Sequence, residues 1–169
     1  MTNISSITAY MKNMKGFSLI ELVVALAVIS IAIAVGLPSL QGISQDSRLT
    51  SAINTLSGDF AFARSEAVTR NVSVRIRTVT ADNNWAGGWI VETLPAVGPA
   101  VTIRNGPALA NNILLTGDAP SLTYNSDGTQ TVGTLNFKSC KNGDVTAHGR
   151  EVRVIPTGRI KLVKNQPCP

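Results

Sequence analysis

The chain has 169 residues, of which 44% are hydrophobic and 15% are charged, and its formal net charge is +5. This length suits one domain with a modest core. The apolar content excludes a disordered chain, and two cysteines are too few for a disulfide-rich mini-domain. With one histidine, His148, and no nucleotide-binding or hydrolase motif, the sequence favours a non-enzyme without catalytic residues, metal or cofactor.

The positive charge lies at the two ends of the chain. Residues 1–16 carry a net charge of +2, residues 17–137 carry −2, and residues 138–169 carry +5. A partner that binds through positive charge should therefore meet an end of the chain rather than its middle.

The first predicted element is a hydrophobic run, Phe17–Leu37, that contains a single charged residue, Glu21. A helix of this length is roughly 31 Å long at about 1.5 Å per residue, which matches the hydrocarbon core of a bilayer. Lys12 and Lys15 precede the run, so the positive-inside rule places residues 1–16 in the cytoplasm. The sequence therefore predicts a membrane protein with one span, residues 17–37, and an exported domain.

Glu21 is unusual inside a membrane span. A carboxylate there costs on the order of 2.5 to 3.5 kcal/mol at the helix centre and less near an end, so such a residue is usually functional or paired. One interpretation is a helix-end acid that reaches the headgroups. The other is a carboxylate with a functional, paired role.

The segment that surrounds this residue, KGFSLIE from Lys15 to Glu21, resembles the class III leader and processing site of type IV pilins and pseudopilins. The resemblance implies that a prepilin peptidase removes residues 1–16 by cutting between Gly16 and Phe17. It also implies that the new amine of Phe17 is N-methylated and that Glu21 helps to dock the subunit, by pairing with the amine of a neighbouring subunit in an apolar filament core. The span is then an inner-membrane anchor, and the domain after it is periplasmic.

A second helical pattern follows the hydrophobic run. Apolar residues recur at spacings of four and three, which is typical of one face of an amphipathic helix. We expect residues 38–70 to continue the first helix and to pack this face on a sheet. The residues of the face are Leu49, Ile53, Leu56, Phe60, Ala63 and Ala67.

Residues 71–169 have the pattern of a β-domain. Short runs rich in β-branched residues are separated by Gly, Pro, Asn and Asp, which predicts one antiparallel sheet or two small ones. Trp85 and Trp89 could form a stacking platform for sugars or bases, but core packing is the favoured interpretation. The predicted strands are 73–79, 89–94, 101–104, 113–116, 122–125, 134–138, 151–155 and 159–163.

Two segments of the amphipathic helix, DSRLT at 46–50 and FARSEA at 62–67, resemble the FimT/FimU and GspH branch of minor pilins. The resemblance implies an α+β, pilin-like fold in which a long N-terminal helix packs on an antiparallel β-sheet domain. We expect Arg64 and Glu66 in the second segment to be solvent-facing helix charges.

Cys140 and Cys168 are the only cysteines, and both fall in the exported, oxidising part of the chain. A disulfide is the expected state, and two free thiols are the alternative. The bond would close a loop around a predicted C-terminal hairpin, whose turn is Pro156–Gly158.

This hairpin holds the candidate DNA-binding residues. Strand alternation predicts that Arg159 and Lys161 share one face while Ile160 and Leu162 face inward. In the FimT branch a Gly-Arg-x-Arg element near the C-terminus contacts DNA. Lys161 stands at its last position here, which keeps the charge but loses a bidentate donor. The other interpretation is a structural edge that faces neighbouring minor pilins. The candidate cations are Arg150, Arg153, Arg159, Lys161 and Lys164.

The sequence predicts a minor type IV pilin that takes part in pilus assembly and priming at the pilus tip, in the service of twitching motility, adhesion or DNA uptake. One alternative is a DNA-binding minor pilin for natural transformation, and another is the minor pseudopilin of a type II secretion system. The expected partners are other minor and major pilins, the prepilin peptidase and the inner membrane. Double-stranded DNA is a further partner in the first alternative.

Overall fold

The computed structural model of the chain describes residues 16–110, 112–143 and 148–168, except for the side chains of residues 35–43 and 45. One long helix, α1 (Leu19–Arg70), precedes the strands, and a short 3-10 helix, η2 (Trp85–Gly87), lies between the first two strands. The chain divides into two compact units, Met1–Gly42 and Ile43–Pro169. The long helix predicted from the sequence is therefore present, and each unit contains part of it.

The first half of α1 is exposed along its whole circumference. Every side chain from Leu19 to Ala34 is exposed, and the large apolar ones expose between 52% and 81% of their surface. Among the described residues, no helix is both long and apolar enough to cross a membrane.

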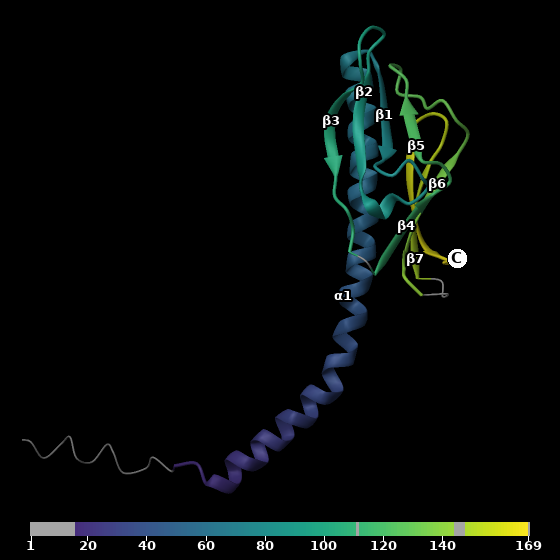
Figure 1. Ribbon diagram of the computed structural model, residues 1–169. Coiled ribbons are helices and arrows are strands. Elements are labelled where there is room, and N and C mark those ends of the chain that lie inside the picture. Colours follow the sequence, from purple (N-terminus) through teal and green to yellow (C-terminus); the bar gives the residue numbers. More distant parts are fainter. Residues whose placement is uncertain (1–15, 111, 144–147, 169) are drawn as a thin grey trace, which may run out of the picture. The chain divides into compact units, whose positions relative to one another are not determined.

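The strands form two antiparallel sheets of four strands each, which is the second of the two arrangements predicted from the sequence (Figure 1). The strand order is β3-β2-β1-β5 in the first sheet and β4-β6-β7-β8 in the second. The bounds are β1 Ser73–Thr78, β2 Trp89–Leu94, β3 Val101–Gly106, β4 Ile113–Gly117, β5 Ser121–Tyr124, β6 Leu135–Lys141, β7 Gly149–Val154 and β8 Ile160–Gln166.

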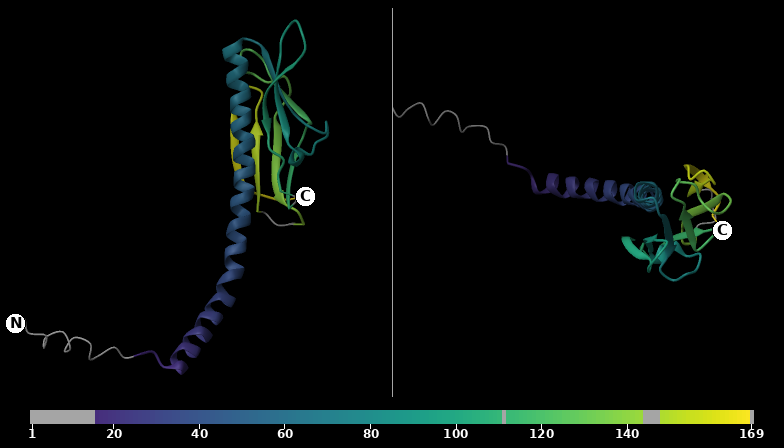
Figure 2. Two further views of the ribbon diagram at one scale, coloured as in Figure 1. Left: turned by 60° about the vertical axis from the view of Figure 1, so that its left-hand side comes forward. Right: turned by 90° about the horizontal axis from the view of Figure 1, so that it is seen from above.

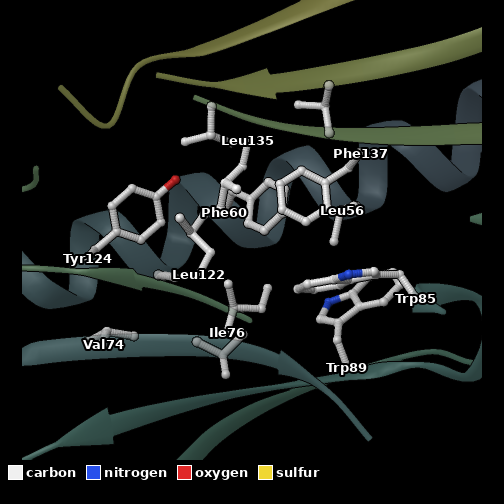
Figure 3. Close-up of a cluster of buried hydrophobic side chains, with 14 of the residues drawn as sticks. Leu56, Phe60, Val74, Ile76, Trp85, Trp89, Leu122, Tyr124, Leu135 and Phe137 are labelled. Atoms are coloured by element: carbon white, nitrogen blue, oxygen red, sulfur yellow. The ribbon is translucent and has the colours of Figure 1, made fainter. Parts of the chain in front are cut away.

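The core lies between the second half of α1 and the two sheets (Figures 2 and 3). The six apolar residues of the predicted helix face are all buried, with at most 4% of their surface exposed. Phe60 is central, because its ring lies 4.7 Å from that of Phe137 on β6 and 5.9 Å from that of Trp85, measured between centroids. Burial of such side chains contributes about 1.5–3 kcal/mol each, so this half of α1 is held by the sheets.

Trp85 and Trp89 are fully buried core residues, as predicted. The indole nitrogen of Trp85 donates to the Ala119 carbonyl at 3.0 Å, and that of Trp89 donates to the Asp59 carboxylate at 2.8 Å. Buried indole groups need such acceptors. Neither ring has an exposed surface on which a sugar or base could stack.

Asp59 is a buried carboxylate on α1 that the sequence analysis did not single out. Its second oxygen accepts from Arg104 on β3 at 2.8 Å, and the Arg104 guanidinium lies 3.7 Å above the ring centroid of Phe62. A buried carboxylate is tolerated when it is paired in this way. The contact ties β3, an outer strand of the first sheet, to α1.

Seven of the eight strands end or begin one to three residues away from the prediction, and β2 alone matches it at both ends. Two of these differences matter for the second sheet. Arg159 belongs to the turn before β8, because its carbonyl accepts the Ile155 amide at 3.1 Å and closes the hairpin there. β6 extends three residues further than predicted, to Lys141, because β4 pairs with it up to that residue. The hairpin therefore presents Arg159 from its turn and Lys161 from a strand.

Candidate assembly and ligand-binding surfaces

The predicted processing site lies at the start of the described chain. Gly16 is exposed, and Phe17 exposes 82% of its surface. Glu21 lies in the first turn of α1, where a negative charge complements the helix dipole. The leader before Gly16, residues 1–15, lies outside the described residues. Cleavage and N-methylation stay predictions, and the exposed Gly16–Phe17 bond suits them.

The predicted disulfide between Cys140 and Cys168 is confirmed, with 5.8 Å between the two Cα atoms. Gly149 packs directly against it. A Cβ atom at Gly149 would lie 3.1 Å from both sulfurs and 2.7 Å from the carbonyl oxygen of Gln166, so a side chain there would displace the strand end. The disulfide ties the end of the chain, just beyond β8, to β6 in the middle of its sheet.

The five predicted cations do not form one patch. Arg150 stands opposite Lys164, and Arg153 stands opposite Lys161, on the paired strands β7 and β8. Directly paired residues share a face, and residues an odd number apart on a strand lie on opposite faces. Arg153 and Lys161 therefore share the outer face of the sheet, away from α1, whereas Arg150 and Lys164 lie on the face toward α1.

Arg150 is a structural residue in this fold. Its Nη2 lies 2.6 Å from the Asp46 carboxylate on α1, and its side chain is only 12% exposed. Its position corrects the prediction that it extends an open cationic surface, because the guanidinium packs between β7 and the helix.

Arg153 is also engaged, on the outer face. Its Nε donates to the Asn136 side-chain oxygen at 2.9 Å, and its Nη2 donates to the Glu151 carboxylate at 2.8 Å. The side chain remains 40% exposed. A phosphate would have to compete with these partners.

Three candidate cations are available to a ligand. Arg159, Lys161 and Lys164 are exposed, and their side chains make no hydrogen bond or ion pair within the described residues. Ile160 and Leu162 lie between them. Leu162 stands opposite the buried Val152, yet 51% of its surface is exposed, because β8 is the last strand of its sheet.

Arg64 has a role that the sequence analysis missed. Its Nε donates to the Gly128 carbonyl at 2.9 Å, and its Nη2 donates to the Thr157 carbonyl at 3.0 Å. The expectation of a solvent-facing charge is therefore wrong for this residue. Only Glu66, which pairs with Arg70 one turn away, makes the expected surface contact.

The β7–β8 turn sits closely against the turn at Gly128. Gly158 has a φ of +75°, and a Cβ atom there would lie 2.0 Å from the Gly128 carbonyl oxygen and 2.8 Å from the Arg64 Nε. Only glycine fits such an approach in this conformation. Arg64 and Gly158 together hold the turn that carries Arg159 against α1.

The first sheet carries its own charged cluster on the face away from the core. Glu92 on β2 exposes 4% of its surface and accepts hydrogen bonds from Arg75 at 2.7 Å and Arg77 at 2.9 Å. Burial opposes its ionisation, but the hydrogen bonds and charges of Arg77 and Arg75 outweigh that effect and lower the pKa of Glu92 below its usual value. The cluster is internally paired, and no group of three or more His, Cys, Asp or Glu in the described residues could hold a metal ion.

A long N-terminal helix whose second half packs on antiparallel sheets, preceded by a Gly-Phe processing motif, defines the class of type IV pilin-like subunits. The profile of the family described as type II transport protein GspH matches residues 52–158. That of the prokaryotic N-terminal methylation motif matches residues 11–37. The chain belongs to the GspH family.

Solved structures with the same fold include both pilins and pseudopilins. The type IV minor pilin FimU of Pseudomonas aeruginosa is 26% identical, with a TM-score of 0.63 over 75% of this chain and 96% of that chain. The minor pseudopilin EpsH of the Vibrio cholerae type II secretion system is 16% identical, with a TM-score of 0.56 over 69% of this chain and 96% of that chain. The likeness to EpsH shows the fold alone. A comparison with curated protein sequences gives no significant match.

Proposed function

We propose that this chain is a minor type IV pilin that takes part in priming pilus assembly at the pilus tip. A prepilin peptidase cuts between Gly16 and Phe17, residues 17–37 anchor the subunit in the inner membrane, and Glu21 docks it against other pilins. Its role is structural, with no catalytic step. The 26% identity to the type IV minor pilin FimU supports a place in a pilus.

The observation that carries the proposal is the exposed apolar surface of α1. Residues 19–34 present large aliphatic side chains in every direction, whereas the family domain that follows has a complete core of its own. Such a surface is stable only when lipid or other apolar helices cover it. A subunit that waits in a membrane and then joins a filament meets this requirement in both states.

A clean deletion, scored in parallel for surface pili, transformation and protein secretion, tests the proposal. Loss of surface pili, restored by the full-length chain, is the expected result. Normal piliation with lost secretion would assign the chain to a type II secretion pseudopilus and overturn the proposal. Normal piliation with lost transformation would favour the DNA receptor described next.

DNA binding is a second candidate function, supported by the three exposed cations Arg159, Lys161 and Lys164. The log of the binding constant for duplex DNA falls with log salt by about 0.9 for each phosphate contact. The test is a gel-shift series with the detergent-solubilised full-length chain at several salt concentrations. In an Arg159→Ala, Lys161→Ala double variant this slope should be less steep, by the equivalent of about two phosphate contacts. An Arg48→Ala, Arg70→Ala variant is the matched control, because both residues are exposed on α1. An unchanged slope in the hairpin variant would remove the hairpin as the DNA site.

A further inference from the structure

A groove of about 450 Å³ runs between the second half of α1 and the start of β8. Its apolar lining comes from Ala61, Val68 and Ile160, and its polar lining includes Arg64, Ser65 and Arg159. All of these residues belong to the C-terminal unit. We call this feature the α1–β8 groove.

The lining of the groove combines exposed aliphatic surface with positive charge. Val68 exposes 52% of its surface, which leaves an aliphatic floor open to solvent. The lining contains two arginines and no carboxylate. Its missing complement is therefore an apolar group joined to a negative charge.

We propose that the α1–β8 groove binds a segment of a neighbouring pilin in which a carboxylate stands beside an aliphatic or aromatic side chain. The carboxylate pairs with Arg159, and the apolar side chain covers Val68 and Ile160. This inference rests on the proposed function, since it assumes that the chain joins other pilins, and it adds the surface and the chemistry of the contact.

The mixed lining favours a protein segment over DNA. A phosphate backbone would satisfy Arg159 but would leave Val68 and Ile160 exposed, because sugar and phosphate carry little apolar surface. Protein interfaces combine both requirements in an apolar centre with a charged rim.

The groove is formed before a partner arrives. Arg64 uses Nε and Nη2 to hold the Gly128 and Thr157 carbonyls, and so it fixes the turn that leads into β8. Gly158 closes this turn against Gly128, where a side chain would not fit. A preformed site loses less conformational entropy when it binds, so a short segment suffices.

The test uses four full-length variants that complement the deletion strain. Val68→Ser removes the apolar floor and Arg159→Glu reverses the charge in the groove. Val79→Ser and Lys161→Glu are the matched controls, because Val79 exposes 53% of its surface just after β1 and Lys161 lies on the outer face of the second sheet. The amount of each variant in sheared surface pili, relative to its amount in the membrane fraction, is the measurement.

The amount of both groove variants in pili should be about tenfold lower than that of wild type, because the loss of a contact of about 1.4 kcal/mol changes binding by a factor of ten. The amount of both control variants should stay within about twofold of wild type. If Arg159→Glu and Lys161→Glu lower incorporation alike while Val68→Ser does not, the site is a general cationic surface and the inference is overturned. Wild-type chain absent from pili would instead contradict the proposed function itself.

A photo-crosslinking amino acid at Ser65, with the same substitution at Val79 as control, identifies the occupant. The expected adduct at Ser65 is a pilin peptide with Asp or Glu next to an apolar residue. An adduct with DNA, or with a peptide that lacks an acidic residue, would overturn the inference.

Discussion

The two halves of α1 differ both in the pattern of their apolar residues and in their surroundings. From Leu19 to Ala34 no side chain is buried, although most are aliphatic. From Leu49 to Ala67 one face packs against two sheets, and its apolar residues expose at most 4% of their surface. The residues on the remaining faces are mostly polar or small. The first half has apolar residues all round, whereas the second has them on one stripe.

The difference shows where each half finds its stability. A single apolar stripe needs one packing surface, which the β-domain supplies. A helix that is apolar all round needs surroundings that are apolar all round, such as lipid or the interior of a filament. In the proposed function, the same helix is thus a domain element at one end and an assembly element at the other.

The largest expected difference between the two halves of α1 comes from truncating one large side chain in each half. Phe60→Ala should lower the free energy of unfolding by about 3–5 kcal/mol, because it removes a fully buried ring. Leu26→Ala, at a residue that is 56% exposed, should change it by less than about 0.5 kcal/mol. Denaturant unfolding of the solubilised chain, followed by the fluorescence of Trp85 and Trp89, measures both. Equal losses in the two variants would contradict the division of α1.

The disulfide should matter to the C-terminal unit alone. Cys140→Ser with Cys168→Ser should lower the free energy of unfolding of that unit by about 3–4 kcal/mol in the chain-entropy model, because the bond closes a loop with a sequence separation of 28 residues. Reduction of the wild-type chain should give the same loss and serves as the control. A reduced chain as stable as the oxidised one would show that β8 holds its place without the bond.

Arg64 tests how firmly the second half of α1 is tied to the β7–β8 turn. Arg64→Ala should lower the free energy of unfolding by about 1.5–3 kcal/mol, because two carbonyls lose a charged donor. Arg70→Ala removes only an exposed pair with Glu66 on the same helix and should cost about 0.3–0.5 kcal/mol. Similar effects for the two variants, by denaturant unfolding, would mean that the Arg64 contacts do not stabilise the fold.

The pH dependence of unfolding should change least. The pKa of Glu92 is lowered in the folded chain relative to its usual value of 4.5. Its ion pairs therefore stabilise the fold fully above pH 4.5. This stabilisation is lost as the pH falls below 4.5 and through the lowered pKa. Glu92→Gln should therefore flatten the loss of stability below about pH 4.5. Unfolding midpoints measured from about pH 2.5 to about pH 6.5, two pH units on either side of 4.5, compare the variant with wild type. Parallel curves for the two proteins would show that other carboxyl groups control acid unfolding.

Local patterns were enough to predict much of this fold. The buried stripe around Phe60 follows from its spacing of three and four, and the strands follow from β-branched runs between turn residues. The disulfide follows from two cysteines in an oxidising compartment. The N-terminal motif follows from a short contiguous string that ends at Glu21.

Contacts between distant residues could not be predicted in this way. Arg64 finds its acceptors 64 and 93 residues further along the chain, and Arg150 finds Asp46 at a separation of 104. Strand order depends on such pairings too. One signal was present in the sequence and unused: Arg150 and Arg153 are three residues apart, so on one strand they must point to opposite faces.

The most direct test of the central claim is the intact mass of the chain extracted from membranes and from sheared pili. A subunit whose first helical half is an assembly element should begin at Phe17, with one methyl group on its amine and with residues 1–16 removed. A mass that still includes the leader, from the initiator Met onward, in both fractions would contradict the claim.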